Sequence, residues 1–185
     1  MAGDADQNKW KDGLKQKFPQ FFNGIKVLDV GSANINGTNK SWFENCEYVG
    51  LDISPWPNVD VVSVAHEYDA PDESFDVVCS TSELEHDIHW KETLLKMVKL
   101  LKPGGFMWFD APHTWAEHGT VEHSPSDSLT SKLNDEWAHY YKNMDIEDIT
   151  SVLNLDEIFE SHEIFYKTIN DGPETSLRFW GIKRR

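Results

Sequence analysis

An acid and a turn glycine stand close together in the most distinctive motif of this 185-residue chain. The motif is Val27-Leu-Asp-Val-Gly31, an apolar run with Asp29 two residues before the glycine. A second acid, Asp52, ends another apolar run about 20 residues later. Ligands of open α/β sheets bind at the carboxyl ends of the strands, where such an acid accepts hydrogen bonds from ribose hydroxyls. The spacing therefore predicts a site for a ribose-containing ligand.

Two groups of histidines are candidates for proton transfer, because imidazole titrates near neutral pH. The first is His86, near Asp87 and His89; the second consists of His113, Glu117, His118 and His123. We predict His86 and His118 as the leading acid/base residues and His113 after them. The alternatives are a hydrogen-bonded residue at the start of a helix for the first group and a solvated polar loop for the second.

Imidazole and carboxylate groups also bind divalent metals. The spacing of the second group fits no compact structural zinc pattern, so we assign no metal site from the sequence. Its His-x4-His-x4-His pattern leaves a divalent ion at this segment as the open alternative.

Strands alternate with helices along the part of the chain that must position these residues. Short apolar runs predict strands at 25–30, 47–52, 59–64, 75–79 and 106–109. Helical spacing or composition predicts helices at 10–18, 38–45, 89–101 and 145–153. Two further runs, 157–169 and 176–182, flank a turn cluster at 170–173. We therefore expect one α/β domain over residues 1–185, with a doubly wound, Rossmann-like, mainly parallel sheet and a C-terminal antiparallel β-hairpin.

Acidic residues outnumber basic ones by 32 to 17, which gives a net charge of −15. This charge argues against nucleic acid and against anionic membranes as partners, since both need clustered Lys and Arg. The two cysteines, Cys46 and Cys79, form no disulfide or zinc pattern. Residues 1–8 are polar and unlike a signal peptide, and we expect them to be disordered. A cytoplasmic protein with a small neutral or cationic ligand is the expectation.

Five short stretches carry a specific resemblance, and they occur in order over residues 25–112. They are Val27-Leu-Asp-Val-Gly31, Tyr48-Val-Gly-Leu-Asp52, Phe75-Asp-Val-Val-Cys-Ser80, Leu84-Glu-His86 and Leu101-Lys-Pro-Gly-Gly105. Together they resemble class I S-adenosylmethionine-dependent methyltransferases of the small type labelled methyltransferase type 11. The resemblance implies that residues 25–112 form the cofactor-binding half and that residues 113–144 form a substrate or lid segment.

The resemblance also implies a role for individual positions. The methionine part of S-adenosylmethionine would lie against the turn after the first strand and the end of the fourth, which hold Asp29, Gly31, Ser32, Ala33, Ser80 and Thr81. Its ribose and adenine would lie against the ends of the second and third strands, which hold Asp52, Ile53, Ala65 and His66. The acid/base histidines would act on the methyl acceptor.

The glycine turn departs from the family pattern Asp-x-Gly-x-Gly-x-Gly. Ala33 and Ile35 occupy the later glycine positions, and glycine is delayed to Gly37, so a reshaped turn is expected. A similar turn occurs in a subgroup that includes sugar or glycan methyltransferases. The expected function is methyl transfer to a small molecule or saccharide, at oxygen. The alternatives are an NAD(P)-dependent Rossmann oxidoreductase and a non-catalytic methyltransferase-like binding protein.

Overall fold

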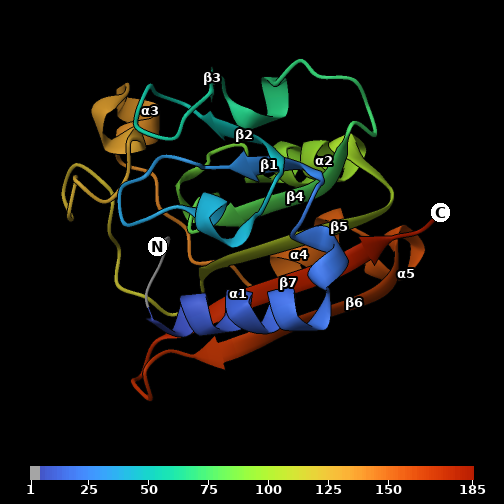
Figure 1. Ribbon diagram of the computed structural model, residues 1–185. Helices are drawn as coiled ribbons and strands as arrows, with labels where there is room; N and C mark the ends of the chain where they lie inside the picture. The colour runs from blue at the N-terminus through green and yellow to red at the C-terminus, as the bar shows by residue number, and fades with distance from the viewer. Residues whose placement is uncertain (1–4) are drawn as a thin grey trace.

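Seven strands form one sheet in the order β3-β2-β1-β4-β5-β7-β6 in the computed structural model, which describes residues 5–185 (Figure 1). The strands are β1 (Lys26–Val30), β2 (Glu47–Asp52), β3 (Val61–Val62), β4 (Phe75–Thr81), β5 (Leu101–Pro112), β6 (Phe159–Thr168) and β7 (Thr175–Lys183). Strands β1 to β5 are parallel, while β7 runs antiparallel to both β5 and β6. This topology confirms the predicted mainly parallel sheet with its C-terminal hairpin.

Helices cover both faces of this sheet (Figure 1). They are α1 (Ala5–Lys17), α2 (Trp90–Leu100), α3 (Asp135–Ala138), α4 (Ile146–Val152) and α5 (Leu155–Ile158), with 3₁₀ turns η1 (Pro19–Phe21), η2 (Asn39–Trp42), η3 (Ala65–Glu67), η4 (Leu84–His86) and η5 (Thr130–Lys132). One apolar cluster packs α1, η1 and η2 against one face of the sheet, and another packs α2, α4 and α5 against the other. Within residues 5–185 no helix combines the length and the apolar content needed to cross a membrane.

The N-terminal helix begins earlier than the sequence predicts. Residues 5–8, which we expected to be disordered, form the first turn of α1, while residues 1–4 lie outside the described part of the chain. Gln7 is 2% exposed, and its amide donates to Asp110 Oδ1 (2.8 Å) and to Ser82 Oγ (3.1 Å). These long-range bonds order the turn, and a count of apolar residues cannot detect them.

Several predicted elements have other boundaries in the structure. The helix expected over 38–45 is reduced to η2, because an isolated bridge between Asn23 and Glu44 follows it at once. The strand expected over 59–64 is only the two residues of β3. The fifth strand begins at Leu101 instead of residue 106, since Leu101 already pairs with Phe75 across a bulge. Strand β4 likewise continues beyond residue 79, to Thr81.

Candidate active site

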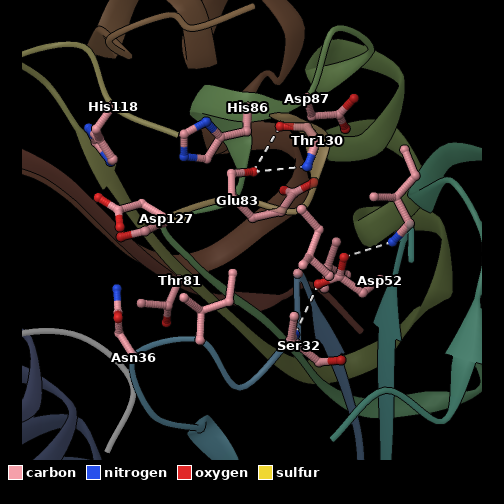
Figure 2. Close-up of a pocket in the computed structure, with 18 of the residues that line it drawn as sticks. Ser32, Asn36, Asp52, Thr81, Glu83, His86, Asp87, His118, Asp127 and Thr130 are labelled. Atoms are coloured by element: carbon pink, nitrogen blue, oxygen red, sulfur yellow. Dashed lines mark hydrogen bonds between the residues drawn. The ribbon is translucent and has the colours of Figure 1, made fainter. Parts of the chain in front are cut away.

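A cavity of about 640 Å³ opens at the carboxyl ends of β1, β2 and β4. Its walls come from the turn after β1, the loop after β2, the segment after β4 and the long segment between β5 and α4. Figure 2 shows His118 and Asp127 on the side of the cavity away from Asp52. The two groups of residues predicted from the sequence, on the cofactor side and on the histidine side, therefore meet in one space.

Gly31 turns the chain out of β1 with a φ of +74°, in the left-handed region that favours glycine. A Cβ atom at this position would lie 2.4 Å from Cγ and 2.5 Å from Cβ of Glu83. The backbone of the turn at Gly31 therefore packs directly against the side chain of Glu83, at the start of the segment after β4. Only glycine keeps both walls of the cavity in place.

Asp52 is held by backbone N–H groups on both sides of the cavity floor. Ala33 N donates to its Oδ2 (2.9 Å), and Ile53 N donates to its Oδ1 (2.8 Å). Burial nevertheless raises the pKa of this carboxyl, and the backbone hydrogen bonds oppose that rise. A carboxylate has about four acceptor positions, so Asp52 can still accept a hydrogen bond from a diol such as a ribose.

Asp29 is 1% exposed, and three side chains from other elements hold it. Asn39 Nδ2 (2.8 Å) and Cys79 Sγ (3.5 Å) donate to its Oδ1, and the Tyr48 hydroxyl donates to Oδ2. Burial raises the pKa of Asp29, while these hydrogen bonds lower it. Sequence reasoning did not select Asn39 or Tyr48, because nothing in their local sequence indicates a partner on β1.

Most of the predicted cofactor residues line the cavity, namely Asp29, Gly31, Ser32, Ala33, Asp52, Ile53, Ala65 and Thr81. Ser80 and His66 do not. Because β4 extends to Thr81, Ser80 is still inside the sheet, fully buried and paired with Val30 and Phe109. Ser82 and Glu83, just beyond the end of β4, line the cavity where Ser80 was expected. His66 turns away from it and packs its ring against His89 at 4.4 Å.

The cavity is strongly acidic. Seven of its lining residues carry carboxyl groups: Asp29, Asp52, Glu83, Asp87, Glu117, Asp127 and Glu174. Over the described residues 5–185, no Lys or Arg lines it. Burial, followed by repulsion from Asp87 and other acids, raises the pKa of Glu83 well above its usual range, and its Oε2 has no hydrogen-bond partner. Such a cavity favours a cationic ligand and disfavours an anionic one.

His86 and His118 face each other at the wall opposite Asp52 (Figure 2), with ring centroids 5.3 Å apart and perpendicular planes. Burial lowers the pKa of His86 to about 3, so its imidazole is neutral at physiological pH. His118 Nδ1 lies 3.0 Å from the Ala116 carbonyl, which can only accept. Nδ1 of His118 therefore carries a proton, and in the neutral imidazole Nε2 is the nitrogen with the lone pair.

The second predicted histidine group is dispersed in the structure. The His113 ring stacks on Tyr166 with centroids 3.9 Å apart and does not line the cavity, which contradicts its expected place beside the acceptor. Thr120 links two other members, since its hydroxyl donates to Glu117 (2.9 Å) and accepts from the backbone of His123. Sequence spacing could not foresee this separation, because no regular element carries residues 113–123.

A protein family described as "Methyltransferase domain" matches residues 3–159 of the chain. The chain belongs to this family. Its membership confirms the family that the five sequence motifs predicted and argues against the alternative of a nicotinamide-dependent oxidoreductase. A comparison with curated protein sequences gave no match.

Several solved structures share the fold of this methyltransferase domain at low sequence identity. Haemonchus contortus phosphoethanolamine N-methyltransferase 2, in complex with S-adenosyl-L-methionine, is 17% identical over 96% of this chain, with a TM-score of 0.66. The chain spans about half of that protein (53%). Burkholderia thailandensis 1,6-didemethyltoxoflavin-N1-methyltransferase is 14% identical over 98% of this chain and 79% of its own, with a TM-score of 0.68. Bradyrhizobium japonicum N-methyltransferase NodS is 16% identical over the whole of both chains, with a TM-score of 0.59.

Other cavity residues of the methyltransferase domain were not selected from its sequence. They include Gln7, Glu83, Asp127, Thr130 and Glu174. They come from α1, the segment after β4, the loop before η5, η5 itself and the β6–β7 turn, which approach one another only in the folded sheet. No local motif marks them, apart from the acidity of the chain as a whole.

Proposed function

We propose that the protein transfers a methyl group from S-adenosylmethionine to an oxygen atom of a small neutral acceptor of the saccharide class. One observation carries the proposal: Asp29 and Asp52, near the carboxyl ends of β1 and β2, line the same cavity as His118. A cofactor and an acceptor bound at these two ends would share one enclosed space, which is the arrangement that a direct group transfer requires.

The cofactor side fits S-adenosylmethionine in shape and in charge. A ribose diol can donate to the Asp52 carboxylate, and Asp52 and Gly31 line the same cavity. The ligand carries a sulfonium and an ammonium, and the acidic cavity suits both charges. When bound, it supplies a methyl group that leaves the sulfonium as the acceptor oxygen bonds to carbon.

The acceptor side suits a neutral, ring-shaped molecule. Trp115 and Trp137 line it, and indole faces pack well on the apolar face of a sugar ring. The buried Trp115 Nε1 has no hydrogen-bond partner among residues 5–185. A phosphate or carboxylate on the acceptor would face several acids and no Lys or Arg from residues 5–185. The segment 113–144 would thus select the substrate, as the resemblance implied.

His118 Nε2 would remove the proton of the acceptor hydroxyl as the new oxygen–carbon bond forms. Its Nδ1–H is already fixed on the Ala116 carbonyl, which orients the ring and sets the tautomer that a base needs. His86 packs against this ring and keeps it in place. Buried and with its pKa at about 3, His86 itself is a weak base at neutral pH.

An amine acceptor is the second candidate, because Glu83, Asp87, Glu117 and Asp127 would attract a cationic ligand on this side. The solved structures named above are also N-methyltransferases. An amine must lose its proton before it attacks, and one of these carboxylates could accept it.

The test combines calorimetry and turnover. S-adenosylhomocysteine should bind and NAD should not, and neutral sugars should be methylated in preference to amines. His118→Ala should lower kcat by about 100-fold or more while S-adenosylhomocysteine affinity is unchanged. His139→Ala, which removes an exposed histidine paired with Glu122, is the matched control. Binding without turnover on any acceptor would favour the non-catalytic alternative, and turnover of amines alone would establish the second candidate.

A further inference from the structure

Glu85 is a buried carboxylate that the fold leaves without a partner. It is 0% exposed, and neither of its oxygens forms a hydrogen bond to another residue among 5–185. Buried carboxyl groups nearly always have hydrogen-bond or charge partners, because desolvation without compensation is costly. The methyl transfer proposed above gives Glu85 no role, so its unpaired oxygens need an explanation.

Two imidazoles surround this carboxylate. Oε1 of Glu85 lies 3.8 Å from Nε2 of His86, too far for a hydrogen bond. Glu85, His86 and His118 each offer one ligand atom within 4.8 Å of the other two. This spacing is close to that of donor atoms around one ion, at metal–ligand distances of about 2.0–2.2 Å.

The surroundings hold one of the two imidazoles as metal-binding histidines are held. His118 donates Nδ1–H to the Ala116 carbonyl, which is the usual outer contact of a ligating histidine. Nδ1 of His86 is buried without a hydrogen-bond partner among residues 5–185, and Nε2 is the ring nitrogen beside Glu85, 3.8 Å from its Oε1. Tyr141 closes the site, with its ring 5.6 Å from His86 and 4.9 Å from His118.

We propose that Glu85, His86 and His118 bind one divalent transition-metal ion at the acceptor wall of the cavity. Two neutral imidazoles and one carboxylate suit Mn²⁺ or Zn²⁺ better than Mg²⁺ or Ca²⁺, which prefer oxygen ligands. The set supplies one negative charge to a dication, and the acidic cavity stabilises the remaining positive charge. This assignment differs from the sequence-based alternative, which placed an ion among residues 113–123.

The ion would border the cavity, because His86 and His118 both line it while Glu85 lies behind them. Three protein ligands leave coordination positions for oxygen atoms of an acceptor, such as two neighbouring hydroxyls. This consequence rests on the proposed function; the ion site itself does not. Without the ion, His118 Nε2 would take the acceptor proton as proposed above. With the ion bound, His118 would be a ligand, and the acceptor hydroxyl, with its acidity raised by the ion, would lose its proton to solvent.

Binding of Mn²⁺ to the full, EDTA-treated protein tests the proposal, with free Mn²⁺ followed by electron paramagnetic resonance. One equivalent should bind, and Zn²⁺ should compete for it while Mg²⁺ at equal concentration should not. Glu85→Gln and His118→Ala should each weaken Mn²⁺ binding by at least about 10-fold. Glu122→Gln and His139→Ala remove the same chemical groups from an exposed pair and should leave binding unchanged.

Equal Mn²⁺ binding in the wild type and in all four variants would overturn the proposal, and so would the absence of binding in the wild type. An affinity for Mg²⁺ equal to that for Mn²⁺ would contradict the assignment of imidazole ligands. S-adenosylhomocysteine titrations on the same samples show that each variant is folded. The same titrations separate the two proposals. If the wild type does not bind S-adenosylhomocysteine, the proposed function is contradicted. If the wild type binds S-adenosylhomocysteine and turns over in EDTA but does not bind Mn²⁺, only the ion site is contradicted.

Discussion

Substituting Gly31 by alanine should damage both the fold and the cofactor site. The φ of +74° costs an L-residue about 1–2 kcal/mol, and the new methyl group would overlap Cγ of Glu83 at 2.4 Å. Glu83 cannot relieve the overlap by rotating its tip, because its Cβ is also only 2.5 Å away. Relaxation of such overpacking costs about 1–3 kcal/mol. Gly31→Ala should therefore lower the unfolding free energy by about 2–5 kcal/mol.

Gly13 offers a matched control. It lies within α1, and a Cβ at this position would have nothing within 4 Å. Gly13→Ala should raise stability by about 1 kcal/mol through helix propensity alone. Urea unfolding measures both changes, and calorimetry with S-adenosylhomocysteine should show weaker binding to Gly31→Ala only. Equal stability and equal affinity of Gly31→Ala and the wild type would refute the reasoning about the turn.

Three further predictions concern single residues. Asp52→Ala should weaken S-adenosylhomocysteine binding by roughly 10-fold or more, since it removes charged acceptors for the ribose; calorimetry within twofold of the wild type would contradict this role. Because burial lowers the pKa of His86 to about 3, its stabilising contribution is complete above about pH 6.5 and is lost as pH falls toward 3. His86→Asn should accordingly flatten the pH dependence of unfolding in this range by up to about 1.4 kcal/mol per pH unit, and unchanged slopes would argue against a neutral His86. Gln7→Ala removes the amide that donates to Asp110 and Ser82, so it should lower the unfolding free energy in urea by about 1–3 kcal/mol. A change below about 0.5 kcal/mol would mean that α1 packs independently of these bonds.

Local patterns predicted the strands of the sheet and placed most of the expected cofactor residues along one cavity. The runs that carry Asp29 and Asp52 near their carboxyl ends are mostly apolar because strands inside a parallel sheet are buried. Local patterns predicted the ends of the strands poorly. Ser80 was assigned to a loop although pairing with Phe109 keeps it within β4. Hydrogen bonding to a neighbouring strand sets the end of a strand, and the strand's own residues do not encode that neighbour.

The sequence by itself determined the family, the order of strands and helices and the acidity of the protein, because periodicity, motif order and charge are properties of consecutive residues. Only the tertiary structure decided which side chains meet. It placed His118 beside His86 and moved His113 away to Tyr166, and it left the Glu85 carboxylate buried between imidazoles without a partner. Such contacts depend on the path of an irregular segment across the ends of the strands. That path is fixed by long-range packing, which no repeat or spacing within residues 113–144 records.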